Sequence, residues 1–215
     1  MAIRTLPGSQ HHRMQYRQSK KFIKIIKWFT GLLVLLLISL FVLLYYETAV
    51  TDKADSYVYA LPYATGTSHQ VVQGYGGLFS HRHIAALDFE MPEGTPVYAA
   101  RGGTIYSYRD NSDEGGLTGS YKNKANYIII RHDDGSFGCY WHLQKNGVLV
   151  RKGRVDKGQR IGFSGATGQV VRPHLHFSVK TKLTYDKDSF VQTKFNTTKG
   201  ICILKNRSSY ERPAD

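Results

Sequence analysis

The sequence has few of the residues that cross-link a chain. Only two cysteines, Cys139 and Cys202, occur among 215 residues, and they have no CxxC spacing. They cannot form a thiolate zinc site by themselves. The sequence allows either a disulfide between the two cysteines or two free thiols. Hydrophobic residues make up 41% of the chain, so a real core rather than disorder is expected.

Acidic residues are absent from the first 46 positions. This segment holds seven of the 29 Lys and Arg residues, which leaves 22 basic residues against 16 acidic ones in the remainder. About half of the formal charge of +13 therefore belongs to the N-terminal tail. The remaining excess suits an anionic wall or membrane surface, and we predict no nucleic-acid partner.

Charge of either sign is missing from residues 28–46, which read "WFTGLLVLLLISLFVLLYY". This run approaches the roughly 20 residues that a helix needs to cross a bilayer, and it has aromatic residues at both ends. A core helix would show polar positions, and a cleaved signal peptide would need a small-residue cleavage site that "YETAVTDKAD" does not clearly offer. We predict a single transmembrane helix with the basic tail, residues 1–27, in the cytoplasm.

Everything after this span is then expected outside the cytoplasmic membrane, in the periplasm or the extracellular wall. Residues 47–73 are predicted to be a linker and approach segment, and residues 183–215 a C-terminal β extension and tail. Between them, in residues 74–182, short apolar runs are cut by Gly turns, which predicts a mainly β domain with a hairpin turn at Asp134 and Gly135.

The stretch "RPHLHF" places two histidines one residue apart. In a strand His174 and His176 share one face, while Leu175 and Phe177 share the other and can be core. In "FGCYWHL" the same alternation puts Tyr140 and His142 on one face. Tyr140 is therefore a candidate groove residue, although packing in the core or on the surface also explains it.

Asp88 interrupts the apolar run "AALDF", and a buried carboxylate needs a salt bridge, a backbone cap or a metal. His81 and His83 precede it. A catalytic zinc takes three ligands from His, Asp or Glu and keeps a position for water. One His and the Asp of this segment, with one His of "HLH", would supply such a set. No HExxH motif is present to supply a Glu general base, and "GFSGATG" lacks the Lys-Ser/Thr ending of a phosphate-binding loop.

Three motifs in order, "SHRHIAALDFEMPEGTPVYAA", "YWHL" and "RPHLHF", with "VRKGRVDKGQRIGFSGATG" between the last two, resemble the lysostaphin-like (LytM-type) zinc metallo-endopeptidases. Members of that family cut peptide bonds in bacterial peptidoglycan. The resemblance covers about residues 74–180. It implies an antiparallel β-sheet or sandwich domain with an open groove, one zinc ion, and peptidoglycan peptides as substrate.

The resemblance also implies a set of site residues. The metal ligands are carried over to His81, Asp88 and His176, and the two histidines beside the bound water and substrate to His142 and His174. Many members have a His-x-x-x-Asp spacing, whereas His81 precedes Asp88 by seven positions and His83 by five. A branch with "FSH" and a longer insertion before "ALDF" favours His81, and His83 is the alternative.

The sequence thus predicts a membrane-anchored zinc metallo-endopeptidase that hydrolyses peptidoglycan in cell-wall remodelling. A second hypothesis is an inactive scaffold of the same fold that binds wall peptide or activates a partner hydrolase in the envelope. A third is a His-rich metal-binding protein without hydrolytic activity, which would have no need of His142.

Overall fold

The computed structural model describes residues 8–45, 50 and 54–214. Residues 1–7, 46–49, 51–53 and 215 lie outside this description. They belong to the predicted tail, membrane span, linker and C-terminal extension. The chain divides into two compact units, one formed by the N-terminal helix and one that contains every strand.

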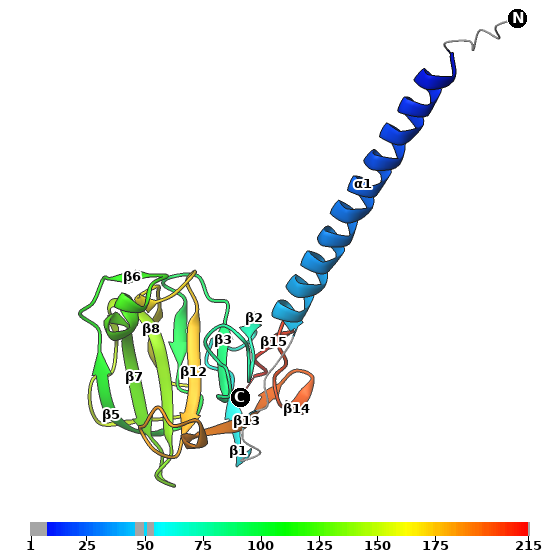
Figure 1. Ribbon diagram of the computed structural model, residues 1–215. Helices are drawn as coiled ribbons and strands as arrows, with labels where there is room; N and C mark the ends of the chain where they lie inside the picture. The colour runs from blue at the N-terminus through cyan, green and yellow to red at the C-terminus, as the bar shows by residue number, and fades with distance from the viewer. Residues whose placement is uncertain (1–7, 46–49, 51–53, 215) are drawn as a thin grey trace, which may run out of the picture. The chain divides into compact units, whose positions relative to one another are not determined.

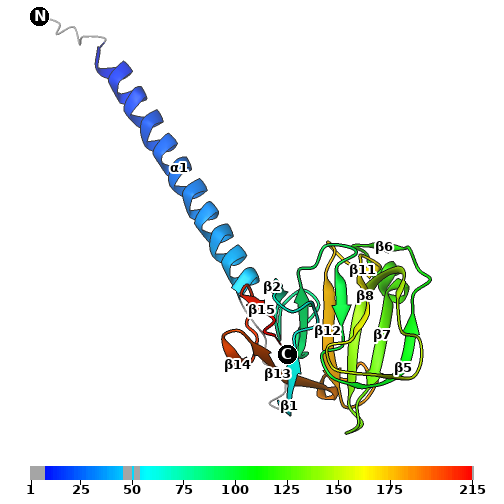
Figure 2. The ribbon, with the colours of Figure 1, turned by 180° about the vertical axis from the view of Figure 1, so that it is seen from behind.

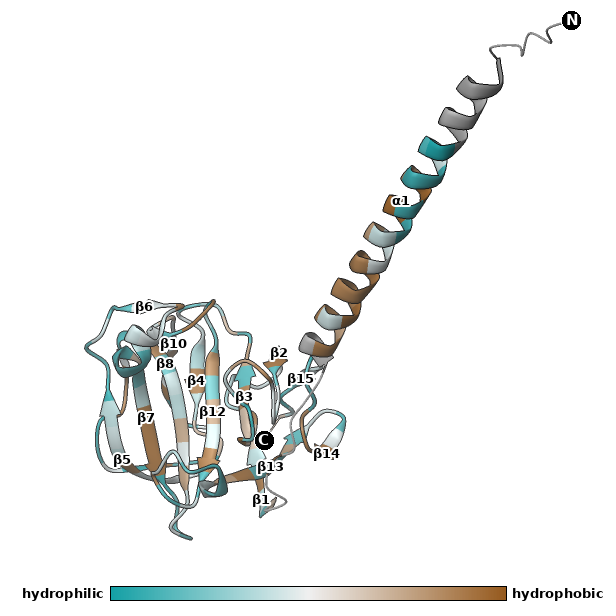
Figure 3. Cartoon of the chain, in the orientation of Figure 1, coloured by the Kyte–Doolittle hydropathy of each residue, from teal (hydrophilic) through white to brown (hydrophobic). Residues whose placement is uncertain are grey.

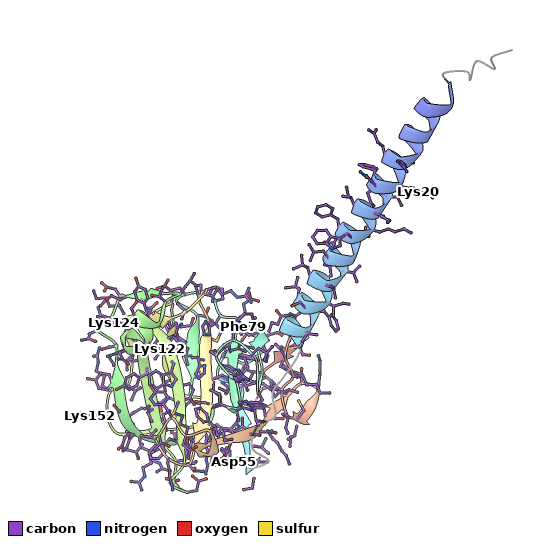
Figure 4. All side chains as sticks on the ribbon, in the orientation of Figure 1. Lys20, Asp55, Phe79, Lys122, Lys124 and Lys152 are labelled. Atoms are coloured by element: carbon purple, nitrogen blue, oxygen red, sulfur yellow. The ribbon has the colours of Figure 1, made fainter. Side chains whose placement is uncertain are left out.

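The N-terminal unit is helix α1, Gly8–Tyr45. Within it Arg17–Val42, 26 residues, is long and apolar enough to cross a membrane by length and composition, and none of it is buried. Within Arg17–Val42 the charged residues lie in the turns before the apolar stretch (Figure 3), and the side chains drawn in Figure 4 project on all sides of the helix. This element is consistent with the predicted membrane-spanning helix.

The second unit is a mostly antiparallel β-sheet, which confirms the predicted fold class. Its strands are β1 Ala54–Ala60, β2 Ser68–Gln73, β3 Ala86–Phe89, β4 Pro96–Tyr98, β5 Gly103–Arg109, β6 Gly115–Gly116, β7 Asn126–Arg131, β8 Phe137–Val148, β9 Arg154–Val155, β10 Arg160–Ser164, β11 Gly168–Gln169, β12 Leu175–Lys180, β13 Phe190–Thr197, β14 Gly200–Cys202 and β15 Ser209–Glu211. Two short 3-10 helices, η1 Gly119–Lys124 and η2 Lys187–Ser189, complete the elements seen in the described part of the chain.

The order β2-β3-β12-β8-β7-β5 runs across the middle of the sheet, and Figure 1 shows these strands side by side. Strands β7 and β8 form the predicted hairpin, in which Gly135 adopts a positive φ of 84° at the turn. At one end of the sheet β6 pairs with β11 in parallel (Figure 2).

One face of the sheet carries the hydrophobic core. Phe177 on β12 lies opposite Tyr140 on β8, and Tyr140 lies opposite Ile128 on β7. All three are essentially inaccessible to solvent. The Tyr140 hydroxyl accepts a hydrogen bond from the Ala100 backbone N at 2.8 Å. Tyr140 is thus a core residue, and the alternative that placed it in a groove is wrong.

Residues on both sides of the predicted domain are part of this core. Strand β1 pairs in parallel with β13, which brings the buried rings of Tyr59 and Phe195 to 6.1 Å between centroids. The Tyr63 hydroxyl donates to the Tyr210 carbonyl at 2.6 Å. Within residues 47–73, predicted to be a linker and approach segment, Ala54–Ala60 and Ser68–Gln73 therefore form strands that pair with the rest of the sheet. Both cysteines are free thiols, with Cys139 buried.

Candidate metal centre

The register of three central strands places two of the predicted ligands side by side. His176 on β12 lies opposite Asp88 on β3, and on its other side it lies opposite Trp141 on β8. Residues opposed across a sheet project from the same face. Since Phe177 and its partner Leu87 fill the core face, His176 and Asp88 project from the other face.

His81 reaches this point from the loop between β2 and β3. It is fully buried. Its Nδ1–H donates to the Gly74 carbonyl at 3.0 Å, so its Nε2 is turned toward Asp88 and His176. His83 is exposed and does not belong to this group. The structure thus places His81, and not His83, together with Asp88 and His176.

Three ligand atoms converge. The distances are 3.1 Å from His81 Nε2 to Asp88 Oδ1, 2.9 Å from His176 Nδ1 to Asp88 Oδ1, and 3.1 Å between His81 Nε2 and His176 Nδ1. A tetrahedral zinc with bonds of about 2.0–2.1 Å separates its ligand atoms by about 3.3 Å. A proton can link only two such atoms well, whereas a cation is bound by all three. These residues therefore fit a zinc ion, and no other group of this kind occurs within the described residues.

The electrostatics of two of the three ligands, Asp88 and His176, agree with this fit. Burial lowers the pKa of His81, but the charge of Asp88 and hydrogen bonds outweigh it and raise that pKa, so a metal must displace a proton there. Burial alone would raise the pKa of Asp88, but the charge and hydrogen bonds of His81 and His176 outweigh it and hold that pKa well below its usual range. Burial lowers the pKa of His176. The carboxylate is thus ionised and His176 favours its neutral form, which is the state that a metal requires of both ligands.

His142 reaches the same face through a break in the strand. Its φ is +67°, and the β7–β8 register skips it, passing from Tyr127↔Trp141 to Asn126↔Leu143. This bulge reverses the alternation, so His142 departs from the face of Tyr140. Its ring centroid lies 4.7 Å from that of His174 and 6.0 Å from that of His176. The shared face predicted for Tyr140 and His142 is therefore wrong.

The ring of His142 has a fixed orientation. Its Nδ1–H donates to the Thr167 carbonyl at 2.7 Å, which leaves Nε2 as the acceptor. Burial, and then the neighbouring His174 and His176, lower the pKa of His142 to about 3. The imidazole is consequently neutral at pH 7 and accepts rather than donates through Nε2.

His174 lies at the start of β12 and is held in a comparable way. An isolated bridge joins it to Gly165, and its Nδ1–H donates to the Arg172 carbonyl at 2.8 Å. A Cβ on Gly165 would lie 2.5 Å from the backbone N of Gln144, so only glycine allows this loop to pass so close to β8. His174 Nε2 faces the centre, 3.7 Å from Asp88 Oδ1.

One further contact has no signal in the sequence. Gln73, the last residue of β2, donates from Nε2 to Asp88 Oδ2 at 3.1 Å. A single glutamine at the end of a strand belongs to no motif. Only the register of β2 against β3, in which Gln73 lies opposite Asp88, reveals it.

Comparison with known proteins agrees with a metallopeptidase. Residues 82–188 match the model of peptidase family M23. The chain therefore contains an M23 domain, a domain of the zinc metallopeptidases that include the lysostaphin-like (LytM-type) enzymes. This confirms the resemblance found in the sequence. His81 lies one residue before the matched segment.

Among the curated relatives is peptidoglycan DD-endopeptidase ShyA of Vibrio cholerae, 42% identical over 93 residues, which are 43% of this chain and 19% of that protein. Cell division protein DipM of Caulobacter vibrioides is 29% identical over 110 residues, 51% of this chain and 16% of that protein. The chain thus spans about a fifth of the length of the curated relatives it matches. Among solved structures, the catalytic domain of lysostaphin from Staphylococcus simulans is 28% identical, with 58% of this chain and 86% of that chain covered and a TM-score of 0.41.

The bulge at His142 leads to a prediction about stability. A side chain at positive φ costs about 1–2 kcal/mol, a cost that glycine does not incur. We expect His142→Gly to be more stable than His142→Ala by about 1 kcal/mol, although both lack the imidazole. Urea unfolding with a chelator present measures the difference. At His174, whose φ is not positive, His174→Ala should instead be more stable than His174→Gly. Equal stability of the two His142 variants would argue against the bulge.

Proposed function

We propose that this chain is a membrane-anchored zinc endopeptidase that hydrolyses peptide bonds in bacterial peptidoglycan. The observation that carries the proposal is the convergence of His81 Nε2, Asp88 Oδ1 and His176 Nδ1 beside two further histidines. The M23 match supports a peptidase. The names of the relatives, which include DD-endopeptidases acting on peptidoglycan, support the substrate.

His81, Asp88 and His176 would hold the ion. Zinc bound there would polarise the scissile carbonyl and lower the pKa of a bound water to about 7. The protein holds the two imidazoles and the carboxylate in one orientation through the hydrogen bond of His81 to Gly74 and the pairing of β3 with β12.

His142 and His174 would handle the protons. Each donates its Nδ1–H to a backbone carbonyl, so each offers Nε2 to the reacting groups. The neutral His142 is suited to accept a hydrogen bond from the attacking water and to orient it. His174, whose Nε2 lies 3.7 Å from Asp88 Oδ1, is suited to pass the proton to the leaving amine or to stabilise the oxyanion.

An inactive scaffold of the same fold is not favoured. Such a protein needs no complete ligand set, whereas here every ligand and both additional histidines lie together. A metal-binding protein without hydrolytic activity would have no use for His142, whose strained backbone is retained beside the centre.

We expect the full chain to bind one zinc ion, as measured by dialysis and elemental analysis. His81→Ala removes a ligand and should weaken zinc binding by more than about 100-fold, beyond the 10–100-fold typical of residues that only support ligands. The matched control His83→Ala should bind zinc as the wild type does, because its side chain lies outside the group. The reverse order of the two variants would assign the first ligand to His83.

Digestion of purified peptidoglycan tests the activity. The wild-type chain with zinc should release cleaved peptides, detected by mass spectrometry, and a chelator should stop the release. Asp88→Asn should abolish it, and His174→Ala should slow it by about 10²–10⁴-fold, the usual contribution of a proton-transferring residue. His83→Ala is again the control. Binding of wall peptide without cleavage by zinc-loaded wild type would support the scaffold hypothesis instead.

The anchor is part of the proposal. The length and composition of Arg17–Val42 support a transmembrane segment, and the basic residues before the uncharged run at residues 28–46 support an N-terminus in the cytoplasm. The β-domain would then lie in the periplasm or the extracellular wall, where peptidoglycan is found.

Protease added to intact spheroplasts should digest the β-domain and leave an N-terminal tag intact. Replacing the lysines before the span by glutamate should disturb this orientation, because basic residues keep a flank in the cytoplasm. These lysines are Lys20, Lys21, Lys24 and Lys27. As a control, the same change is made at Lys122, Lys124, Lys152 and Lys157 of the β-domain, three of which are labelled in Figure 4. Protection of the β-domain in the wild type would contradict the proposed topology.

A further inference from the structure

Gln73 contacts the metal centre from its side. Its Nε2 donates to Asp88 Oδ2 at 3.1 Å, whereas His81 and His176 face Oδ1. The glutamine side chain is buried. The two oxygens of the Asp88 carboxylate thus have different partners. Oδ1 faces the two histidines, and Oδ2 accepts a hydrogen bond from the Gln73 amide.

The orientation of that amide is fixed by Ser80. The Ser80 backbone N donates to Gln73 Oε1 at 3.4 Å, and Gln73 Nε2 donates to Ser80 Oγ at 2.6 Å. A Cβ on Gly77 would lie 2.6 Å from Gln73 Cγ, so the loop closes directly over the side chain. A rotated amide would place its carbonyl against the carboxylate. The contacts with Ser80 therefore present the NH₂ group to Asp88.

The neighbouring residue supports a second ligand. The Gly74 carbonyl accepts the Nδ1–H of His81 at 3.0 Å. Two consecutive residues at the end of β2 thus hold two of the three ligands. Both precede residues 82–188, the segment that the family model matches, so this support is read from the structure of this chain.

We propose that Gln73 is a positioning residue that restricts Asp88 to binding the metal through Oδ1 alone. The inference rests on the proposed zinc site. A carboxylate can bind a metal through one oxygen or two. An N–H donated to Oδ2 opposes binding through both oxygens and keeps a coordination position for water, as a catalytic zinc requires.

The test uses the full chain with Gln73→Met, which has a similar length and no N–H to donate. The matched control is Gln70→Met on the same strand, because the Gln70 amide donates to the Arg207 carbonyl at 3.3 Å. Two quantities are measured. The first is the zinc dissociation constant, obtained from competition with a chromogenic chelator. The second is the visible absorption of the cobalt-substituted protein. This absorption weakens as the coordination number of the metal rises above four.

We expect Gln73→Met to weaken zinc binding by about 10–100-fold and to lower the cobalt absorption, and Gln70→Met to change neither. Failure of the wild type to bind zinc would overturn the proposed function itself. Wild-type zinc binding together with an unchanged affinity and cobalt spectrum in Gln73→Met would overturn only the role of Gln73.

A second variant is needed in case the buried substitution Gln73→Met prevents folding. Thermal unfolding of the metal-free proteins shows whether it does. Ser80 is exposed, and Ser80→Ala removes the acceptor that orients the Gln73 amide. We expect a several-fold loss of zinc affinity with unchanged thermal stability. If Gln73→Met does not fold, an unchanged affinity in Ser80→Ala would overturn the inference.

Discussion

The opposition of Asp88 and His176 across β3 and β12 is the constraint on which the site depends. A buried carboxylate without partners would cost several kcal/mol, and this register supplies its partner at 2.9 Å. A slip of β12 by one residue would turn His176 into the core and bring Phe177 to the metal face. The apolar alternation that builds the core therefore also fixes the metal centre.

The same row of opposed residues extends on both sides of the ligands. Gln73 lies opposite Asp88, and Trp141 lies opposite His176. Next to Trp141 the strand bulges at His142, which adds an imidazole that a regular strand would direct into the core. A bulge of this kind re-aims one side chain and leaves the pairing on either side intact. The sheet supplies the ligands, and the bulge at His142 supplies a second kind of group.

What the sequence could predict follows from this arrangement. The faces of "HLHF" were predictable because β12 is regular, and Asp88 because a carboxylate in an apolar run needs partners. The face from which His142 projects was not predictable, because the sequence "FGCYWHL" does not show where a bulge interrupts the alternation. Strand β1, "ADSYVYA", has mixed burial and no clean alternation of polar and apolar residues, so its sequence does not distinguish it from a linker. Gln73 acts only through its partner across the sheet, which sequence order does not show.

The loop that carries His81 explains how a ligand seven residues from Asp88 can still be well placed. Backbone hydrogen bonds close it on itself, from His81 N to the Gly77 carbonyl at 3.1 Å and from Gly76 N to the Ile84 carbonyl at 3.1 Å. Its ring is then held by Gly74. These contacts all lie within the protein, so they hold His81 in the orientation that faces Asp88 and His176. A longer spacing than the common one is compatible with a metal site because the hydrogen bonds of the loop bring His81 to Asp88.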